Sequence, residues 1–423
     1  MELNTITRRC RRLLGLMLLG TSIHSLGAPA TPANTLTLQD ALTRTLAHNP
    51  ALYQYRFHKA ALLASKQNDA LSPALAVELN VENIAGTGAK QGVQEAETTL
   101  ALSSVIELGG KQQARLTYAD ARIRHAQYQH QATSLDVLAQ LTTHYIESLA
   151  TQANRELAQR SLDFTHSLLD TMSERAQRGA TPEAEVLRAK AAVARADMQL
   201  TALQRKFERQ KIQLARYWGE TQTPFQRLDG SLFEFGASEP FAELYQRAQR
   251  SPALQVFASE KRLQEAQLSL AHADQRSDLT WRLGVKHFAA TDDAALTAGV
   301  SMPLFANQRG STQVKAAQAK RDAIDYAETD QRLRLHAQLF NAYSLRQQGI
   351  DNATKMAEVV IPALEQALEL TQTAYDNGRY QYQDLMAARE ELLAARQARI
   401  DAATTALVSQ ALIEQLTGAP FTQ

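Results

Sequence analysis

The sequence predicts a mainly α-helical protein with a small β part, built from two similar halves. The first observation is an internal repeat at a spacing of about 200 residues. Asn-Pro-Ala-Leu at 49–52 returns as Ser-Pro-Ala-Leu at 251–254, and Trp-Gly at 218–219 returns as Thr-Gly at 417–418. The second is that long stretches without proline or glycine alternate with short segments of period two. A repeat that covers nearly the whole chain predicts one elongated body built twice.

The first repeat is predicted over 36–218. Leucines at helical spacing predict a helix over 38–71, broken where Asn49 precedes Pro50, because a residue before proline disfavours the helical conformation. Alternation of apolar and polar residues predicts strands over about 74–84 and 97–107. A helix over 111–178, without proline or glycine, and a helix over 182–218 complete this half.

An irregular crossover is predicted over 219–239, and the second repeat over 240–420. Its predicted elements are a helix over 240–276, strands over about 278–288 and 294–303, and helices over 311–377 and 381–417. Gly349 and Pro362 predict local irregularities within the longest of these helices.

Each predicted strand has one apolar and one polar face. Val77 and Leu79 alternate with Glu78, and the polar face also carries the charged residues Glu82, Arg282 and Lys286. This pattern is typical of strands between lipid and water, although a half-buried soluble hairpin would show it too. No stretch of 18 apolar residues follows the N-terminal segment, so a membrane crossing would have to use strands.

Residues 1–30 predict a secretion signal peptide, because a basic region at 8–12 precedes an apolar run at 13–19 and small residues near 27–30, where cleavage is expected. Cys10, the one cysteine, lies inside it, so the mature chain is expected to have no disulfide. The 45 basic and 44 acidic residues nearly balance, which does not favour nucleic acid as a partner.

With these features the chain resembles the TolC family of outer-membrane efflux proteins over 36–420. The resemblance rests on the repeat, the four strand segments, the Asn-Pro-Ala-Leu sequence at 49–52 and two glycine-marked hairpin tips. Glu-Leu-Gly-Gly-Lys at 107–111 and Arg-Gly-Ala-Thr-Pro-Glu at 178–183 are most similar to the CzcC-like heavy-metal branch, the cobalt-zinc-cadmium resistance channels.

The resemblance implies a homotrimer in the outer membrane, with a 12-stranded β-barrel continued by a long α-helical coiled-coil barrel in the periplasm. It implies a periplasmic membrane-fusion adaptor, an inner-membrane RND-type pump and outer-membrane lipid as partners. The predicted function is a passive channel for divalent heavy-metal cations in a tripartite efflux system. The alternatives are a multidrug or organic-solute duct of the same family and a periplasmic coiled-coil scaffold.

Neither catalytic residues nor a cofactor or metal site is predicted, so the protein is not expected to be an enzyme. The histidines are scattered; His125 and His130 are five residues apart, which does not fit a helical metal pair. Function is placed at the hairpin tips instead. The residues predicted to dock the adaptor are Arg178, Gly179, Thr181, Pro182, Asn377 and Gly378. Thr181 is expected to cap a helix that begins with Pro182.

The predicted periplasmic gate consists of Tyr375, Arg379, Asp384 and Glu185. Glu185 and Asp384 each follow a tip glycine by six residues, so in a trimer they would form rings of carboxylates; the alternative is an acid that favours its own helix dipole. The resemblance implies a tyrosine, an arginine and aspartates at the gate. Arg379 stands one place before the expected arginine and Ala387 replaces the second aspartate, so a different latch is expected.

Overall fold

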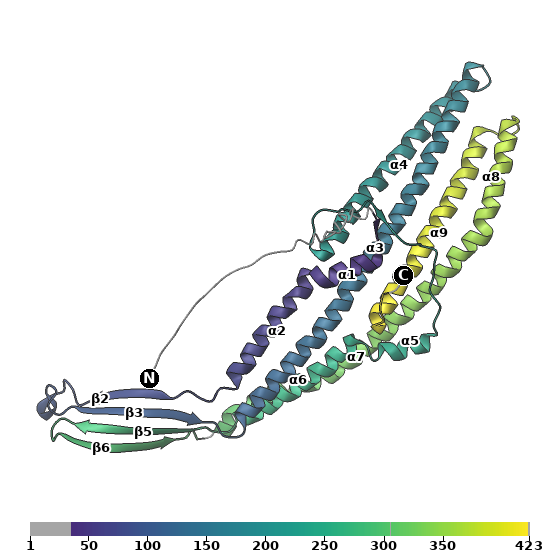
Figure 1. Cartoon of the computed structure of the whole chain (residues 1–423). Coiled ribbons are helices and arrows are strands. Elements are labelled where there is room, and N and C mark those ends of the chain that lie inside the picture. The colour runs from purple at the N-terminus through teal and green to yellow at the C-terminus, as the bar shows by residue number, and fades with distance from the viewer. Residues whose placement is uncertain (1–34, 305, 422–423) are drawn as a thin grey trace, which may run out of the picture.

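The computed structural model describes residues 35–304 and 306–421, so the predicted signal peptide at 1–30 lies outside the described residues. The described chain is mostly helical with a small sheet, which confirms the coarse fold class. Figure 1 shows an elongated molecule with the sheet at one end and two helical hairpins at the other.

The elements follow in nearly the predicted order. The first half contains β1 (Thr35–Leu36), α1 (Leu38–His48), α2 (Pro50–Asp69), β2 (Ala76–Glu82), β3 (Glu97–Ile106), α3 (Lys111–Gln177) and α4 (Glu183–Ala215). The second half contains β4 (Arg227–Leu228), α5 (Phe241–Ala248), α6 (Pro252–Asp274), β5 (Leu279–Phe288), β6 (Asp293–Ser301), α7 (Ala306–Lys355), α8 (Ile361–Asp376) and α9 (Tyr382–Thr417). Two short 3₁₀ turns lie at Gly88–Lys90 and Arg216–Trp218.

The break between α1 and α2 has a local cause. Asn49 has an extended backbone, and its side-chain oxygen accepts hydrogen bonds from the N–H groups of Ala51 and Leu52. Its amide also donates to the carbonyl of Tyr217 at 2.8 Å, which joins this break to the end of α4. Proline in the first turn of α2 loses no hydrogen bond there, because that N–H has no partner within the helix.

The sheet is antiparallel with the order β2-β3-β5-β6, so β2 and β6 are open edges. Its register places apolar side chains on one face, and these are exposed in the single chain: Val77 is 72% and Leu296 is 89% exposed. The other face carries ion pairs. Arg282 pairs with Glu78 at 2.8 Å, and Lys286 pairs with Glu82 at 3.2 Å and with Glu97.

The helices form an open layer. Near the sheet, neighbours in contact give the order α2, α3, α6, α7; towards the tips they give α4, α3, α9, α8. The outermost helices are therefore α2 and α7 in the first part and α4 and α8 in the second. Each has a face that is covered by no helix of the described chain.

The main apolar core lies halfway along the molecule, where the short β1–β4 pair packs against α3. The hydroxyl of Tyr145, which is fully buried, lies 2.7 Å from the carbonyl of Leu36 and 2.6 Å from that of Asp229. Gln152 bonds both the N–H and the carbonyl of Leu228. These side chains of α3 hold the crossover segment in place.

The long helix of the second half is interrupted. A π-helical turn at Met356–Val360 separates α7 from α8, and Pro362 follows it. Proline has no N–H and its ring clashes with the carbonyl four residues earlier, so a widened turn before it relieves both problems. The irregularity expected at Pro362 is thus a π turn, whereas Gly349 lies inside the continuous α7.

Gly349 lies at a close approach of α7 and α9. A Cβ there would lie 2.7 Å from the carbonyl oxygen of Ala402 and 2.9 Å from the nitrogen of Ala406. Because both atoms belong to the backbone, the helices would have to separate, and we expect Gly349→Ala to destabilise the fold by about 1–3 kcal/mol. Thermal unfolding measures this. Gly299→Ala, where a Cβ meets no atom within 4 Å, is the control and should change the unfolding temperature little.

Candidate functional site: the two hairpin tips

The two tips turn in the same way. Gly179 and Gly378 have φ of 75° and 72°, the left-handed conformation that glycine adopts at little cost. In each turn the residue after glycine donates its N–H to a carbonyl five residues earlier: Ala180 to Arg175 at 2.9 Å and Arg379 to Ala374 at 2.8 Å. These bonds satisfy carbonyls at the ends of α3 and α8.

The expected cap at Thr181 is wrong by one position. Pro182, with φ −63° and ψ 142°, is the capping residue, and α4 begins at Glu183 without a side-chain cap. The reason is that proline tolerates an extended ψ as well as the first helical position. Arg178 is exposed and pairs with Glu174 over 3.7 Å, and Asn377 is exposed and bonds the carbonyl of Thr373.

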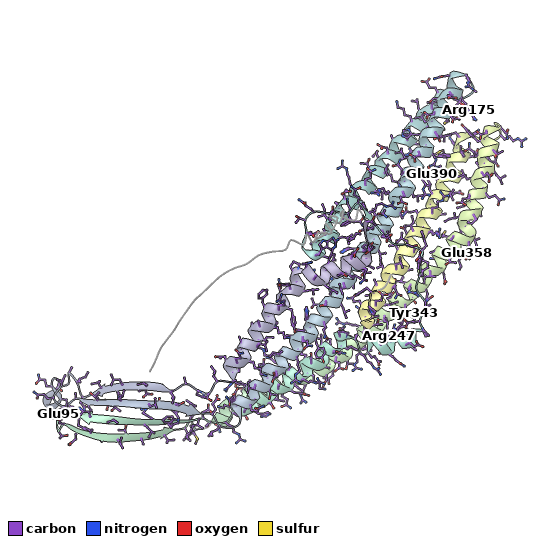
Figure 2. The ribbon with its side chains drawn as sticks, in the orientation of Figure 1. Glu95, Arg175, Arg247, Tyr343, Glu358 and Glu390 are labelled. Carbon is purple, nitrogen blue, oxygen red and sulfur yellow. The ribbon has the colours of Figure 1, made fainter. Side chains whose placement is uncertain are left out.

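A contact between the tips lies just above these turns. Tyr375 at the end of α8 is 6% exposed, and the guanidinium of Arg175 in α3 lies 5.1 Å from its ring centre. The same guanidinium pairs with Asp376 at 3.0 Å. Figure 2 places Arg175 at the tip of the α3–α4 hairpin. Burial raises the pKa of Tyr375, so its hydroxyl stays protonated.

An apolar cluster supports this contact. It contains Leu168 and Met172 from α3, Ala189 from α4, Tyr375 from α8, and Tyr382 and Leu385 from α9. The pKa of Tyr382 is raised by burial, and the charge of Glu185 adds to the increase for both tyrosines. Glu185 is half-buried, and its charge acts on both rings, so two of the predicted gate residues, Glu185 and Tyr375, lie in the same region of the structure.

The other two predicted gate residues have different surroundings. Asp384 is exposed, and its carboxylate accepts the N–H of Gln381 at 2.9 Å in a reciprocal capping box at the start of α9. Arg379 is exposed, and its recorded bond is the backbone bond that closes the turn. These contacts agree with the alternative interpretation of Asp384, in which the acid stabilises the start of its own helix.

Sequence reasoning missed Arg175 and Asp376. They are 201 residues apart and pair across the two hairpins. A signal was present, because a basic residue precedes the first tip glycine and an acidic residue precedes the second within one helical turn. Reading the two tips against each other would have suggested that these opposite charges meet.

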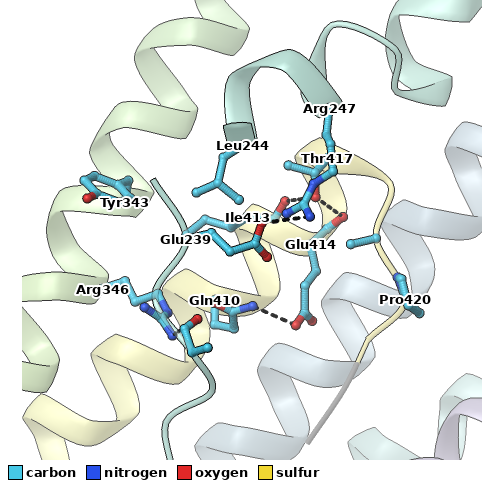
Figure 3. Close-up of a pocket in the computed structure, with 12 residues that line it drawn as sticks. Glu239, Leu244, Arg247, Tyr343, Arg346, Gln410, Ile413, Glu414, Thr417 and Pro420 are labelled. Carbon is cyan, nitrogen blue, oxygen red and sulfur yellow. Dashed lines mark hydrogen bonds and ion pairs between the residues drawn. The ribbon is translucent and has the colours of Figure 1, made fainter. Parts of the chain in front are cut away.

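A separate cavity of about 240 Å³ lies where α5, α7 and α9 meet (Figure 3). Arg346 is buried in its wall and donates to the carbonyl of Gly236 at 2.7 Å, and burial lowers its pKa. Glu239 pairs with Arg247 at 2.8 Å. Because these charged groups bind each other and the crossover backbone, the wall holds the crossover against α7 and α9.

Within residues 35–304 and 306–421, no three histidine or acidic side chains are grouped closely enough to hold a metal ion. No helix in that part of the chain is long and apolar enough to cross a membrane.

Residues 41–220 match the family model described as outer membrane efflux protein. The chain is 25% identical over 302 residues to the cobalt-zinc-cadmium resistance protein CzcC of Cupriavidus metallidurans. This match covers 71% of this chain and 72% of that protein. It is 23% identical over 325 residues to the nickel-cobalt-cadmium resistance protein NccC of Alcaligenes xylosoxydans, covering 74% and 71%.

Solved structures share the fold. The CusC channel superimposes with a TM-score of 0.76 at 13% identity, covering 90% of this chain and 92% of that one. The outer membrane protein VceC of Vibrio cholerae gives 0.73 at 18% identity, covering 91% and 97%.

The match over residues 41–220 and the shared fold make the chain similar to outer-membrane efflux channels of the TolC type, which confirms the predicted resemblance and the predicted location. Within that class, the curated relatives it matches are heavy-metal resistance proteins, as the similarity of 107–111 and 178–183 to that branch predicted.

Proposed function

We propose that this chain forms a homotrimeric channel that conducts divalent heavy-metal cations from a periplasmic adaptor and an inner-membrane pump to the exterior. The observation that carries the proposal is that the outer edges of the protomer have strands without a neighbour and helix faces without cover, which a second copy would supply. These edges are the two open strands and the exposed faces of α2, α7, α4 and α8.

Near the sheet, the exposed faces of α2 and α7 carry apolar residues three or four positions apart, the spacing of a coiled-coil seam. On α2 these are Tyr53, Phe57, Ala60 and Ala64, and on α7 they are Ala316, Ala319, Ala323, Tyr326, Leu333, Ala337 and Phe340, with Asp330 completing the register. Tyr326 is 81% and Leu333 is 68% exposed. We call these two sets the α2 seam and the α7 seam.

Towards the tips, α4 and α8 continue the pattern. Leu187, Ala191, Ala194 and Met198 follow it on α4, and Val359, Ala363 and Leu370 follow it on the π turn and α8, with the polar residues Gln366 and Thr373 completing the register. Each pair of seams lies on opposite edges of one layer. Contacts of this head-to-tail kind close into rings, and a ring of three copies buries every seam.

The sheet supports the same assembly. Its edges β2 and β6 carry unpaired backbone groups, which lipid cannot satisfy, so a closed barrel of three sheets removes the difficulty. The exposed apolar face suits lipid, and the face with the ion pairs of Arg282 and Lys286 suits a wet pore.

At the far end, the tips with Arg178, Gly179, Asn377 and Gly378 dock the adaptor, and the contact between the hairpins closes the tunnel. We assign the latch to Arg175 and Asp376 with Tyr375, supported by Glu185. Arg379 and Asp384 stay candidates for contacts between copies. Because the pump supplies the energy, this chain is proposed to carry out no chemical step.

The cargo is proposed from the names of the relatives, so it needs a direct test. In a strain that lacks this gene, cell-associated zinc, cobalt and cadmium should increase several-fold under metal challenge and return to normal on complementation. Retention of organic dyes with unchanged metal would instead indicate an organic-solute duct. Unchanged retention of both would contradict the efflux proposal.

A further inference from the structure

Between the main core and the tips, the two helical hairpins have separate apolar clusters. An apolar cluster of Ala158, Leu162 and Leu200 joins α3 to α4, and another of Ile361, Leu392 and Ala395 joins α8 to α9. Neither includes a buried residue of the other hairpin. The main core joins α9 to α3 at one end of this stretch, and the apolar cluster at the tips joins the hairpins at the other. Between these two clusters the contact between the hairpins depends on the line where α9 lies along α3.

A buried cation lies on that line. Arg389 of α9 is 6% exposed, its Nη2 donates to the carbonyl of Ser161 at 2.9 Å, and its guanidinium lies 3.5 Å from the ring centre of Phe164. Its Nη1 has less than 1 Å² of accessible surface and no hydrogen-bond partner among the described residues. With so little accessible surface, neither solvent nor a neighbouring copy can reach this atom while the hairpins are together.

The favourable contacts of the guanidinium do not offset the free-energy cost of removing its charge from water. A desolvated guanidinium on a ring and one charge-assisted hydrogen bond are favourable, but removing a charge from water costs more unless its remaining donors are paired. Burial lowers the pKa of Arg389 to about 10, so its surroundings disfavour the charge. Among the described residues, no carboxylate pairs with this cation, which lies between the two hairpins.

A second buried polar atom without a partner in the described part of the chain lies on α3. The side-chain oxygen of Asn154 in α3 is also buried without a partner among the described residues. A cavity of about 310 Å³ between α3, α4 and α9 is lined by Asn154 and Ser161, together with Gln199 and Glu390. Figure 2 shows Glu390 on α9, between the π turn and the tip. Ser161 is also the residue whose carbonyl accepts the hydrogen bond of Arg389, so water that enters as the hairpins part would hydrate Asn154 and reach the acceptor of that bond.

We infer that burial of Arg389 between the hairpins, without a counter-ion, destabilises the closed tunnel. Arg389 raises the free energy of the closed state and therefore favours separation of the hairpins once the latch is released. The inference rests on the proposed function only in taking hairpin separation as the opening step. The device needs no ligand, because hydration of the guanidinium supplies the difference between the two states.

The test measures the distance between the tips directly. Cysteines at Ala180 and Tyr380, both exposed, carry spin labels in full-length trimers diluted with unlabelled chain, and Asp376→Asn weakens the latch. In this background, Arg389→Met should reduce the population with separated tips about tenfold, and it should raise the unfolding temperature. Arg396→Met is the control, because Arg396 pairs with Glu365 inside the α8–α9 hairpin.

An unchanged or larger separated population in Arg389→Met, or an equal effect of Arg396→Met, would overturn the inference. If the methionine variant does not assemble, Arg389→Gln removes the charge while keeping a donor for Ser161, and the same expectation applies. Metal retention in the deletion strain tests the proposed function separately, since the distances do not depend on any cargo.

Discussion

Replacing Tyr326 and Leu333 of the α7 seam by glutamate is expected to leave the chain monomeric. Both side chains are exposed in the single chain, at 81% and 68%, so the folded protomer should tolerate the change. In the ring each would bury an unpaired carboxylate against the α2 seam, at a cost of several kcal/mol per contact, repeated in three interfaces. Trimer content should therefore fall by at least a hundredfold, as measured by sedimentation of the detergent-solubilised protein.

The matched control is Gln338→Glu, which adds a charge to the same exposed stretch of α7 but outside the seam. It should leave the trimer intact. Phe57→Glu on the α2 seam should reproduce the loss, because the two seams would meet in the proposed trimer. A double variant that remains trimeric with unchanged helix content would contradict the arrangement of the protomers.

Reversing the charge of the latch with Arg175→Glu is expected to open the tunnel. The pair with Asp376 is partly exposed, so its ion-pair energy is discounted to about 0.5 kcal/mol, and the contact with the Tyr375 ring adds about 0.5–1 kcal/mol. The variant also adds repulsion, and three copies act together. Mean current across planar bilayers should rise at least tenfold.

Two further variants make this test specific. Exchanging the charges, Arg175→Glu with Asp376→Arg, should restore low current, because the pair re-forms with opposite polarity. Asp384→Ala removes the capping box at α9 and should cost about 1 kcal/mol of local helix stability, with a smaller rise in current. A larger rise for Asp384→Ala than for Arg175→Glu would move the gate to Asp384.

The element boundaries could be predicted because local chemistry determines them. Pro50 and Pro252 begin helices, and Gly179 and Gly378 lie in the turns that follow helices. Period-two alternation marks the strands, so each signal lies within a few residues of its effect. The branch of relatives could also be suggested, from two short sequences at 107–111 and 178–183.

The latch and the buried cation could not be predicted in the same way. Arg175 meets Asp376, and Arg389 meets Phe164, across more than 200 residues of sequence, and helical periodicity gives the face of a helix but not its partner. For Asp384 the family pattern and the local contacts suggest different roles. A family pattern pointed to it, whereas its side chain is engaged by the backbone three residues away.

The two long helices differ in how they would transmit force. α3 runs for 67 residues without interruption, about 100 Å of stiff rod from the sheet to the tip. Its counterpart is divided by the π turn at Met356–Val360 into 50 and 16 residues. A pull on the tip of α8 can therefore be absorbed at this joint, while a pull on α3 travels its whole length. An adaptor bound to both tips would therefore bend the α8–α9 hairpin relative to the continuous α3, and the sheet end would not move.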